Sequence, residues 1–167
     1  PRAVLLDPSV LDTLPPRQVR AGWAEVIKHG LILDLDLIEA LESELAAGRT
    51  APSAKLIGRS AAIKAAVVSE DEREEGRRTL LNYGHTVGHA IEAVTGYTDY
   101  LHGEAVAVGM RVAGVLSVEL GLLRPDEFDR QQALLRAAGL PEAAPGVALD
   151  AVLDAPRGDK KVADGAI

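Results

Sequence analysis

The chain has 167 residues, of which 47% are apolar and 26% charged, a balance typical of one globular domain with a hydrophobic core. Aromatic residues make up only 3%, so Leu, Val, Ile and Ala must fill the core, and Ala and Leu favour helix. The absence of cysteine excludes disulfides and thiolate metal sites, and the net charge of −7 argues against a nucleic-acid partner. With no secretion signal and no uncharged apolar run of about 18 residues, we expect a cytoplasmic protein without membrane contact.

The first segment of the chain predicts a strand. AVLLD, residues 3–7, is a short apolar run closed by Asp-Pro. Because no partner strand follows in the next hundred residues, we expect this strand to pair with a sheet outside the chain. We therefore assign residues 1–14 to a strand and linker of a preceding domain, and residues 15–167 to a helical domain.

The rest of the chain predicts helices separated by proline and glycine. The fold class is mainly α, a bundle-like domain with one short N-terminal strand. The charge-rich segment SEDEREEGRR after the third helix is predicted to be a solvated helix end and loop. The two helices that follow are apolar over most of their circumference, so we expect them to be central. The predicted helices span 15–29, 34–48, 52–68, 80–96, 103–120 and 125–139, with a short last helix within 146–155.

The stretch LLNYGHTVGHAIE, residues 80–92, places His85 and His89 one helical turn apart on the same face. Gly84 and Gly88 each cost this helix about 0.8–1.0 kcal/mol of propensity relative to Ala. Glycines let a ligand or another helix approach the backbone closely. The stretch is therefore either the wall of a binding site or a tightly packed helix whose histidines bond to carbonyls.

Two further segments carry candidate polar groups. In AGWAEVIKHG, Glu25 and Lys28 lie three residues apart near a face that we expect to be buried, either as an ion pair at the edge of the core or as part of a site. In DYLHGEAV, His102 stands just before a helix, and Glu104 falls in the first turn, where a carboxylate complements the helix dipole.

These groups together suggest a metal site. Glu25, His85 and His102 would supply one carboxylate and two imidazoles, the ligand set of a catalytic zinc with an open position for water or substrate. His85 with His89 is the rival pair, at a spacing common in metal sites. Spacing alone does not choose between His89 and His102.

Cationic side chains form a second group: Lys28, Lys64, Arg78, Lys160 and Lys161. Solvated surface charge is the ordinary alternative for each of them. Lys64, however, lies in the apolar segment AAIKAAVV. A cluster of Lys and Arg side chains near a metal would bind a small anionic substrate. Arg presents a planar pair of donors to a carboxylate, and Lys presents a point charge to a phosphate.

Five segments resemble a known family in order and spacing. AGWAEVIKHGLI, IKAAVVSEDERE, RTLLNYGHTVGHAIEAVTGY, LHGEAVAVGM and DKK are similar to the C-terminal domain of the 3-dehydroquinate synthase family, within the sugar-phosphate cyclase superfamily. The resemblance covers essentially the whole chain. LLNYGHTVGHAIE with LHGEAVAVGM is highly specific to the superfamily, while Lys64, Arg78 and Asn82 favour this member over its relatives.

The resemblance implies a role for each candidate residue. Glu25, His85 and His102 would bind Zn²⁺, with Co²⁺ as a substitute. The other residues would contact the substrate: Lys28 a hydroxyl near the metal, Lys64 and Arg78 the carboxylate, and Asn82, His89 and Lys160 the phosphate side, with Lys160 favoured over Lys161. Lys28, His89 and Asn82 would be the catalytic residues among them.

The resemblance also implies the reaction and the partners. In the family, NAD is bound by a preceding α/β domain, and the active site lies in the cleft between the two domains of a homodimeric enzyme. The substrate is 3-deoxy-D-arabino-heptulosonate 7-phosphate, which undergoes transient oxidation by NAD, phosphate elimination, re-reduction, ring opening and aldol closure. The fragment alone would then be inactive, and the NAD site would lie mostly outside it.

Three alternatives remain open at this point. Another sugar-phosphate cyclase with the same fold would make an inosose, valiolone or aminodehydroquinate product. An iron-dependent alcohol or glycerol dehydrogenase also binds metal with histidines of a helical domain, although a neutral alcohol needs no carboxylate and phosphate contacts. The domain could finally be a metal-binding or oligomerising module without turnover.

Overall fold

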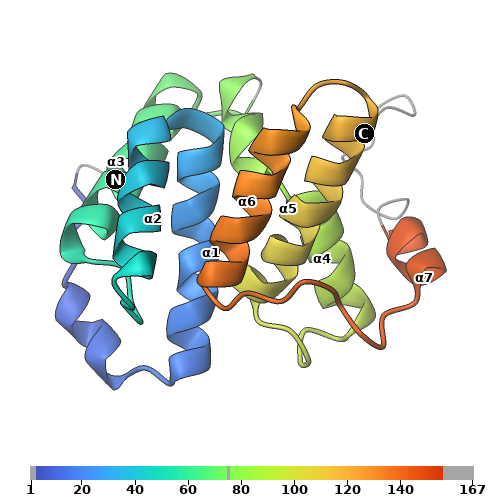
Figure 1. Cartoon of the computed structure of the whole chain (residues 1–167), viewed down its shortest axis with the longest axis horizontal. Helices are drawn as coiled ribbons and strands as arrows, with labels where there is room; N and C mark the ends of the chain where they lie inside the picture. The colour runs from blue at the N-terminus through green and yellow to red at the C-terminus, as the bar shows by residue number, and fades with distance from the viewer. Residues whose placement is uncertain (1–2, 75, 156–167) are drawn as a thin grey trace.

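The computed structural model describes residues 3–74 and 76–155, and its regular elements are helices (Figure 1). Within these described residues, six α-helices of ten or more residues pack together, and two 3₁₀ helices and a short α7 complete the set. The elements are η1 (Pro8–Thr13), α1 (Pro16–Leu33), α2 (Leu35–Ala46), α3 (Ala54–Glu70), η2 (Arg77–Asn82), α4 (His85–Val94), α5 (His102–Glu119), α6 (Pro125–Ala137) and α7 (Leu149–Asp154).

The prediction of a strand at residues 3–7 is wrong. These residues have no regular structure, and Leu5 is 96% exposed. Within the described part of the chain no other segment is extended into a strand, so this one has no ladder in which its backbone groups could pair. Asp7 instead caps η1, because its side chain accepts a hydrogen bond from the Ser9 amide at 3.0 Å.

Helix α1 lies at the centre of the molecule and packs against α2, α3, α5, α6 and η2 (Figure 1). Its buried face joins the main core, in which Trp23, Ile27, Leu41, Met110 and Leu135 are almost completely excluded from solvent. Burying side chains of this size stabilises the fold by about 1.5–3 kcal/mol each. The site described below therefore draws on a helix that the core holds in place.

The predicted end of α1 at Gly30 is wrong, since the helix continues to Leu33. Gly30 serves close packing rather than helix termination: a Cβ there would lie 2.7 Å from Cδ1 of Ile38 on α2. The next residue, Asp34, lies between the two helices, and its side chain accepts a hydrogen bond from the Leu37 amide and caps α2.

The predicted continuous helix over 80–96 is interrupted. The segment begins as the 3₁₀ helix η2, and Gly84 then adopts a left-handed φ of 78°, which places His85 at the first position of α4. We expected the two helices of 80–96 and 103–120 to be central; in the structure α4 and α5 pack closely against one another, and glycines make this contact possible. A Cβ on Gly109 would lie 1.9 Å from the carbonyl oxygen of Gly84, and one on Gly88 would lie 3.1 Å from Cα of Val106.

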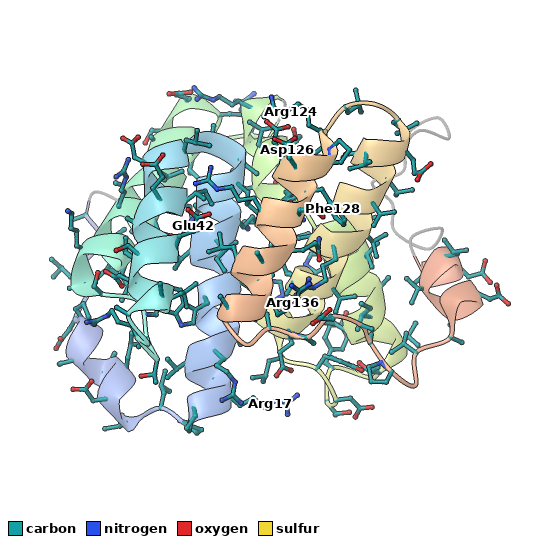
Figure 2. All side chains as sticks on the ribbon, viewed as in Figure 1. Arg17, Glu42, Arg124, Asp126, Phe128 and Arg136 are labelled. Carbon is teal, nitrogen blue, oxygen red and sulfur yellow. The ribbon has the colours of Figure 1, made fainter. Side chains whose placement is uncertain are left out.

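The remaining predicted helices are confirmed, with boundaries that agree to within three residues. Figure 2 shows Arg124 and Asp126 together at the start of α6, where the Arg124 guanidinium donates to the Asp126 carboxylate at 3.1 Å. Glu104 caps α5 as predicted, because its carboxylate accepts a hydrogen bond from the Leu101 amide at 2.9 Å. Among the described residues, no helix has the length and apolar character needed to cross a bilayer.

Candidate metal centre

Three helices bring Glu25, His85 and His102 together. Glu25 lies in the middle of α1, His85 is the first residue of α4, and His102 is the first residue of α5. Nε2 of His85 lies 3.6 Å from Oε1 of Glu25, and Nε2 of His102 lies 3.8 Å from the same oxygen. One ligand atom from each residue falls within 4.8 Å of the others.

The free polar atoms of this group face one another. Oε1 of Glu25 is buried and has no hydrogen-bond partner, whereas Oε2 accepts a hydrogen bond from Lys28 at 2.8 Å. Nδ1 of His85 lies 3.2 Å from the carbonyl oxygen of Tyr83, and Nδ1 of His102 lies 3.2 Å from both oxygens of Glu92. Each Nδ1 therefore has a partner, and each Nε2 is directed toward the unpartnered oxygen.

This arrangement fits a divalent metal ion. Two ligand atoms that each lie about 2.1 Å from a tetrahedral zinc ion are about 3.4 Å apart. The observed separations of 3.6 and 3.8 Å are close to that value and too long for hydrogen bonds. A buried polar atom without a partner requires an explanation, and an ion shared by Glu25, His85 and His102 supplies one.

The charges around the centre favour the protonation states that a metal requires. Burial would raise the pKa of Glu25, but the charge and hydrogen bond of Lys28 outweigh it, so the pKa is lowered. The pKa of His85 is lowered, mainly by burial and then by the positive charge of Lys28. An ionised carboxylate and a neutral imidazole are the forms that bind metal ions.

His89 belongs to a different grouping. Its side chain is exposed, and the centroid of its ring lies 5.3 Å from that of His85 and 5.8 Å from that of His102. In the described part of the chain, the second set of residues close enough to hold an ion is His89, Glu92 and His102. The i,i+4 spacing thus brings the rings of His85 and His89 close together. Each ring lies near a different carboxylate, His85 near Glu25 and His89 near Glu92.

The backbone around His85 is fixed by contacts that spacing could not predict. The Tyr83 hydroxyl donates to Gln131 at 2.8 Å, and the Gln131 amide donates to the carbonyl oxygen of Met110 at 2.9 Å. These bonds tie the turn before α4 to α5 and α6. Since the carbonyl of Tyr83 is the partner of His85 Nδ1, they also help to hold the imidazole in place.

Of the cationic residues, Lys28 is buried at the centre, with 3% of its side chain exposed. Burial lowers the pKa of Lys28, the charge and hydrogen bond of Glu25 oppose that effect, and the charge of Lys64 adds to it. Lys64 on α3 is exposed, contrary to what its apolar neighbours in the sequence suggest. Lys160 and Lys161 lie outside the described residues.

Glu74 is a polar residue of this region that the sequence analysis missed. Its carboxylate accepts a hydrogen bond from Asn82 at 2.9 Å and lies 4.0 Å from the Arg78 guanidinium. Its backbone has a left-handed φ of 61°. The segment predicted to be only a solvated loop therefore holds Arg78 and Asn82 in a fixed relation. In the sequence, Glu74 is one of several acidic residues in a row, and nothing distinguishes it.

His29 is a second residue without a predicted role. It is buried beside Lys28, its Nδ1 lies 2.7 Å from the Ser60 hydroxyl, and its Nε2 is buried without a hydrogen-bond partner. Burial, assisted by the charge of Lys28, lowers the pKa of His29 to about 4. The ring is therefore neutral at physiological pH and forms part of the packing behind the centre.

Comparison with protein families gives a match over residues 22–162 to the model described as the 3-dehydroquinate synthase C-terminal domain. The chain belongs to this family. The match contains Glu25, His85, His102 and the residues around them.

Curated relatives agree with this membership. The chain is 51% identical to a 3-dehydroquinate synthase of Synechococcus sp. (strain ATCC 27144) over 173 residues, which cover 100% of the chain and 47% of the relative. It is 51% identical to the enzyme of the same name from Gloeobacter violaceus and 48% identical to that from Nostoc punctiforme, each match covering 100% of the chain. The chain thus spans about half the length of the curated relatives that it matches.

Solved structures give the same fold. A 2-epi-5-epi-valiolone synthase from Streptomyces hygroscopicus, described with NAD⁺ and Zn²⁺ bound, matches with a TM-score of 0.79 at 30% identity, over 89% of this chain and 42% of that protein. A 2-deoxy-scyllo-inosose synthase, described in complex with carbaglucose-6-phosphate, NAD⁺ and Co²⁺, matches with a TM-score of 0.75 at 29% identity, over 92% of this chain and 42% of that protein.

Proposed function

We propose that this chain is the metal- and substrate-binding domain of a 3-dehydroquinate synthase of the shikimate pathway. The whole enzyme converts 3-deoxy-D-arabino-heptulosonate 7-phosphate to 3-dehydroquinate and phosphate. The observation that carries the proposal is the buried Oε1 of Glu25, which lacks a hydrogen-bond partner and faces Nε2 of His85 and of His102. The names of relatives that are about half identical over the whole chain support the activity.

In this proposal Glu25, His85 and His102 hold Zn²⁺, for which Co²⁺ can substitute. When bound, the ion supplies Lewis-acid polarisation of a substrate hydroxyl and of the carbonyl formed from it. A set of three protein ligands leaves coordination positions for the substrate. The ions named for the two structural neighbours support the choice of metal.

Lys28 is proposed to act on the substrate hydroxyl beside the metal. Its ammonium group donates to Glu25, so it already lies at the edge of the centre. The lowered pKa of Lys28 makes proton exchange with a hydroxyl easier than it would be for an exposed lysine. Its near-complete burial also fixes the direction in which the ammonium points.

The remaining polar residues are proposed to bind the anionic groups of the substrate. Lys64 and Arg78 contact the carboxylate, and Asn82 and His89 contact the phosphate side, together with Lys160. The shared partner Glu74 supports joint action by Arg78 and Asn82, because it holds both on one turn. Catalysis would then rest mainly on positioned charges and on one bound conformer of the substrate.

The second half of the active site is proposed to lie in a preceding NAD-binding domain, to which residues 1–14 connect the helical domain of residues 15–167. The chain spans about half the length of the relatives that it matches, which supports a second domain. The structural neighbours are described with NAD⁺ bound, which supports NAD as the cofactor of that domain. We further propose a cytoplasmic homodimer, as the resemblance implies.

A second candidate is another sugar-phosphate cyclase, because the structural neighbours are named valiolone and inosose synthases. The two candidates share the metal centre and differ in the substrate's anionic groups. Lys64, Arg78 and Asn82 favour the first, since they supply contacts for a carboxylate as well as a phosphate.

The test is an activity assay on the chain joined to its N-terminal domain, with zinc, NAD and the heptulosonate phosphate. We expect stoichiometric release of phosphate and 3-dehydroquinate from the joined protein, and no turnover by the 167-residue chain alone. Turnover by the chain alone would contradict the two-domain site. Phosphate release from a different sugar phosphate, but not from this one, would favour the second candidate.

A further inference from the structure

The carboxylate of Glu92 lies within hydrogen-bonding distance of an imidazole of the candidate metal centre, that of His102. Glu92 lies in the last turn of α4, and 11% of its side chain is exposed. Both of its oxygens lie 3.2 Å from Nδ1 of His102. Carboxylates are rarely this buried unless they are paired or bonded, so the contact with His102 accounts for the burial of Glu92.

His102 needs such a partner more than His85 does. His85 has 14% of its side chain exposed and is held by the carbonyl of Tyr83, whereas His102 has 46% exposed and stands at the first position of α5. A half-exposed imidazole at a helix end can take several rotamers and either neutral tautomer. A proton on Nδ1, donated to the carboxylate, leaves the lone pair on Nε2, the atom directed toward Glu25.

We propose that Glu92 is a positioning residue that orients His102 and selects the tautomer with a free Nε2. This inference rests on the proposed metal centre and adds a residue that does not touch the ion. A carboxylate that accepts the other ring proton of a metal-bound histidine fixes the ring and raises its basicity, and removal of such a partner typically weakens metal binding about 10–100-fold.

The rival arrangement is an ion held by His89, Glu92 and His102, whose ligand atoms also lie within 4.8 Å of one another. In that case Glu92 would be a ligand. The hydrogen-bonding geometry favours the positioning role: Nδ1 of His102 is equidistant from both oxygens, as expected for a ring N–H shared by a carboxylate. The two roles predict different effects of the same substitutions.

The first experiment measures the zinc dissociation constant of the chain by chelator competition. We expect Glu92→Ala to weaken binding by about 10–100-fold. Glu92→Gln should weaken it less, because the amide oxygen still accepts the Nδ1 proton while the charge is lost. Glu119→Ala, at the opposite end of α5 and on an exposed residue, is the matched control and should bind zinc as the parent does. Circular dichroism of each variant verifies that the helices are intact.

The second experiment records the ring ¹⁵N signals of His102 in the metal-free chain at a pH about two units above the ordinary imidazole pKa. We expect protonated Nδ1 in the parent and in Glu92→Gln, and a loss of this preference in Glu92→Ala. A role of Glu92 in packing alone would leave the tautomer unchanged.

The outcomes separate this inference from the proposed function. Zinc binding and a tautomer unaffected by Glu92→Ala would overturn the positioning role while leaving the centre intact, provided that Glu25→Ala abolishes binding. If Glu92→Gln and His89→Ala abolish zinc binding and Glu25→Ala does not, the ion lies in the rival group, and both proposals fail.

Discussion

Two regions of the molecule, the junctions of α2 with its neighbours α3 and α6 and the candidate metal centre, place charged side chains where helices meet, and they differ in how completely those side chains are paired. At the junction of α2 and α3, Arg59 donates to both oxygens of Asp34 at 2.6 Å. At the junction of α2 and α6, Arg130 donates to both oxygens of Glu42 at 2.7 and 2.8 Å (Glu42 in Figure 2). At the metal centre, Glu25 keeps one buried oxygen without a hydrogen-bond partner.

The difference separates structural from functional polar groups. A bidentate pair between arginine and carboxylate satisfies both partners and needs no further group. The centre instead presents one carboxylate oxygen and two imidazole nitrogens to a shared space, where a single bound cation would satisfy all three at once. Four predictions test this contrast, from the largest expected effect to the smallest.

The largest effect is expected from removal of a proposed ligand. His102→Ala should weaken zinc binding by more than the roughly 100-fold upper value for an orienting residue, because the ion loses a direct bond. His89→Ala, on the neighbouring exposed ring, should retain zinc and lose affinity for phosphate. Metal analysis after dialysis measures the first effect, and phosphate binding measures the second. Equal loss of zinc in the two variants would indicate that His89 is also a ligand, as in the alternative i,i+4 pair of His85 and His89.

The next effect concerns the contact that brings the two histidine-bearing helices together. Gly109→Ala should destabilise the fold by about 3 kcal/mol or more, because the added Cβ would overlap the carbonyl oxygen of Gly84 at 1.9 Å and force α4 away from α5. Gly58→Ala, on exposed α3 surface with nothing within 4 Å, is the control and should stabilise by about 0.5–1 kcal/mol. Denaturant titration measures both. Equal stability of the two variants would contradict the role of the glycine contact.

A third prediction asks whether every unpartnered buried atom near the centre serves the metal. His29 has such an atom, and burial lowers its pKa to about 4, so the unfolded chain takes up a proton before the folded chain does. Stability should therefore fall as the pH drops from about 6.5 to 4, with a contribution from His29 on the order of 2 kcal/mol. His29→Asn should flatten this slope and leave zinc binding unchanged. A parent-like slope in the variant would show that other groups cause the acid sensitivity.

The smallest effect is expected at a complete pair. The hydrogen bonds from Arg59 and from the Leu37 amide outweigh the burial of Asp34 and lower its pKa, so their stabilising contribution is present at neutral pH and is lost as the pH falls below about 4. Asp34→Asn keeps a capping side chain and should lower the Tm at pH 7 by only about 2 °C. Thermal unfolding measures it. Any loss of zinc binding in this variant would contradict the contrast between the two regions.

The sequence predicted the helices well because proline, glycine and capping residues mark their ends. It failed at Gly30, which serves packing against Ile38, and at residues 3–7, where apolar character alone does not create a partner strand. The interruption at Gly84 was missed because its left-handed φ follows from the close contact with α5, a property of the packed molecule.

At the candidate site, too, the sequence predicted the residues themselves but not the contacts that surround them. Residue types and the family resemblance pointed to Glu25, His85 and His102, which the fold brings together. The contacts around these residues could not be predicted: Glu92 lies beside His102, the carbonyl of Tyr83 lies beside His85, and Glu74 contacts Asn82 and Arg78 rather than the three candidate ligands. Lys160 lies outside the described residues, and its role stays a prediction.

The central claim is that one divalent ion is shared by three helices. The most direct measurement is a crystal structure of the chain grown with zinc, with anomalous diffraction recorded at the zinc absorption edge. We predict a single strong peak bonded to Oε1 of Glu25 and to Nε2 of His85 and His102, with Glu92 on the far side of the His102 ring. A peak on His89 and Glu92, or no peak among these residues, would contradict the account.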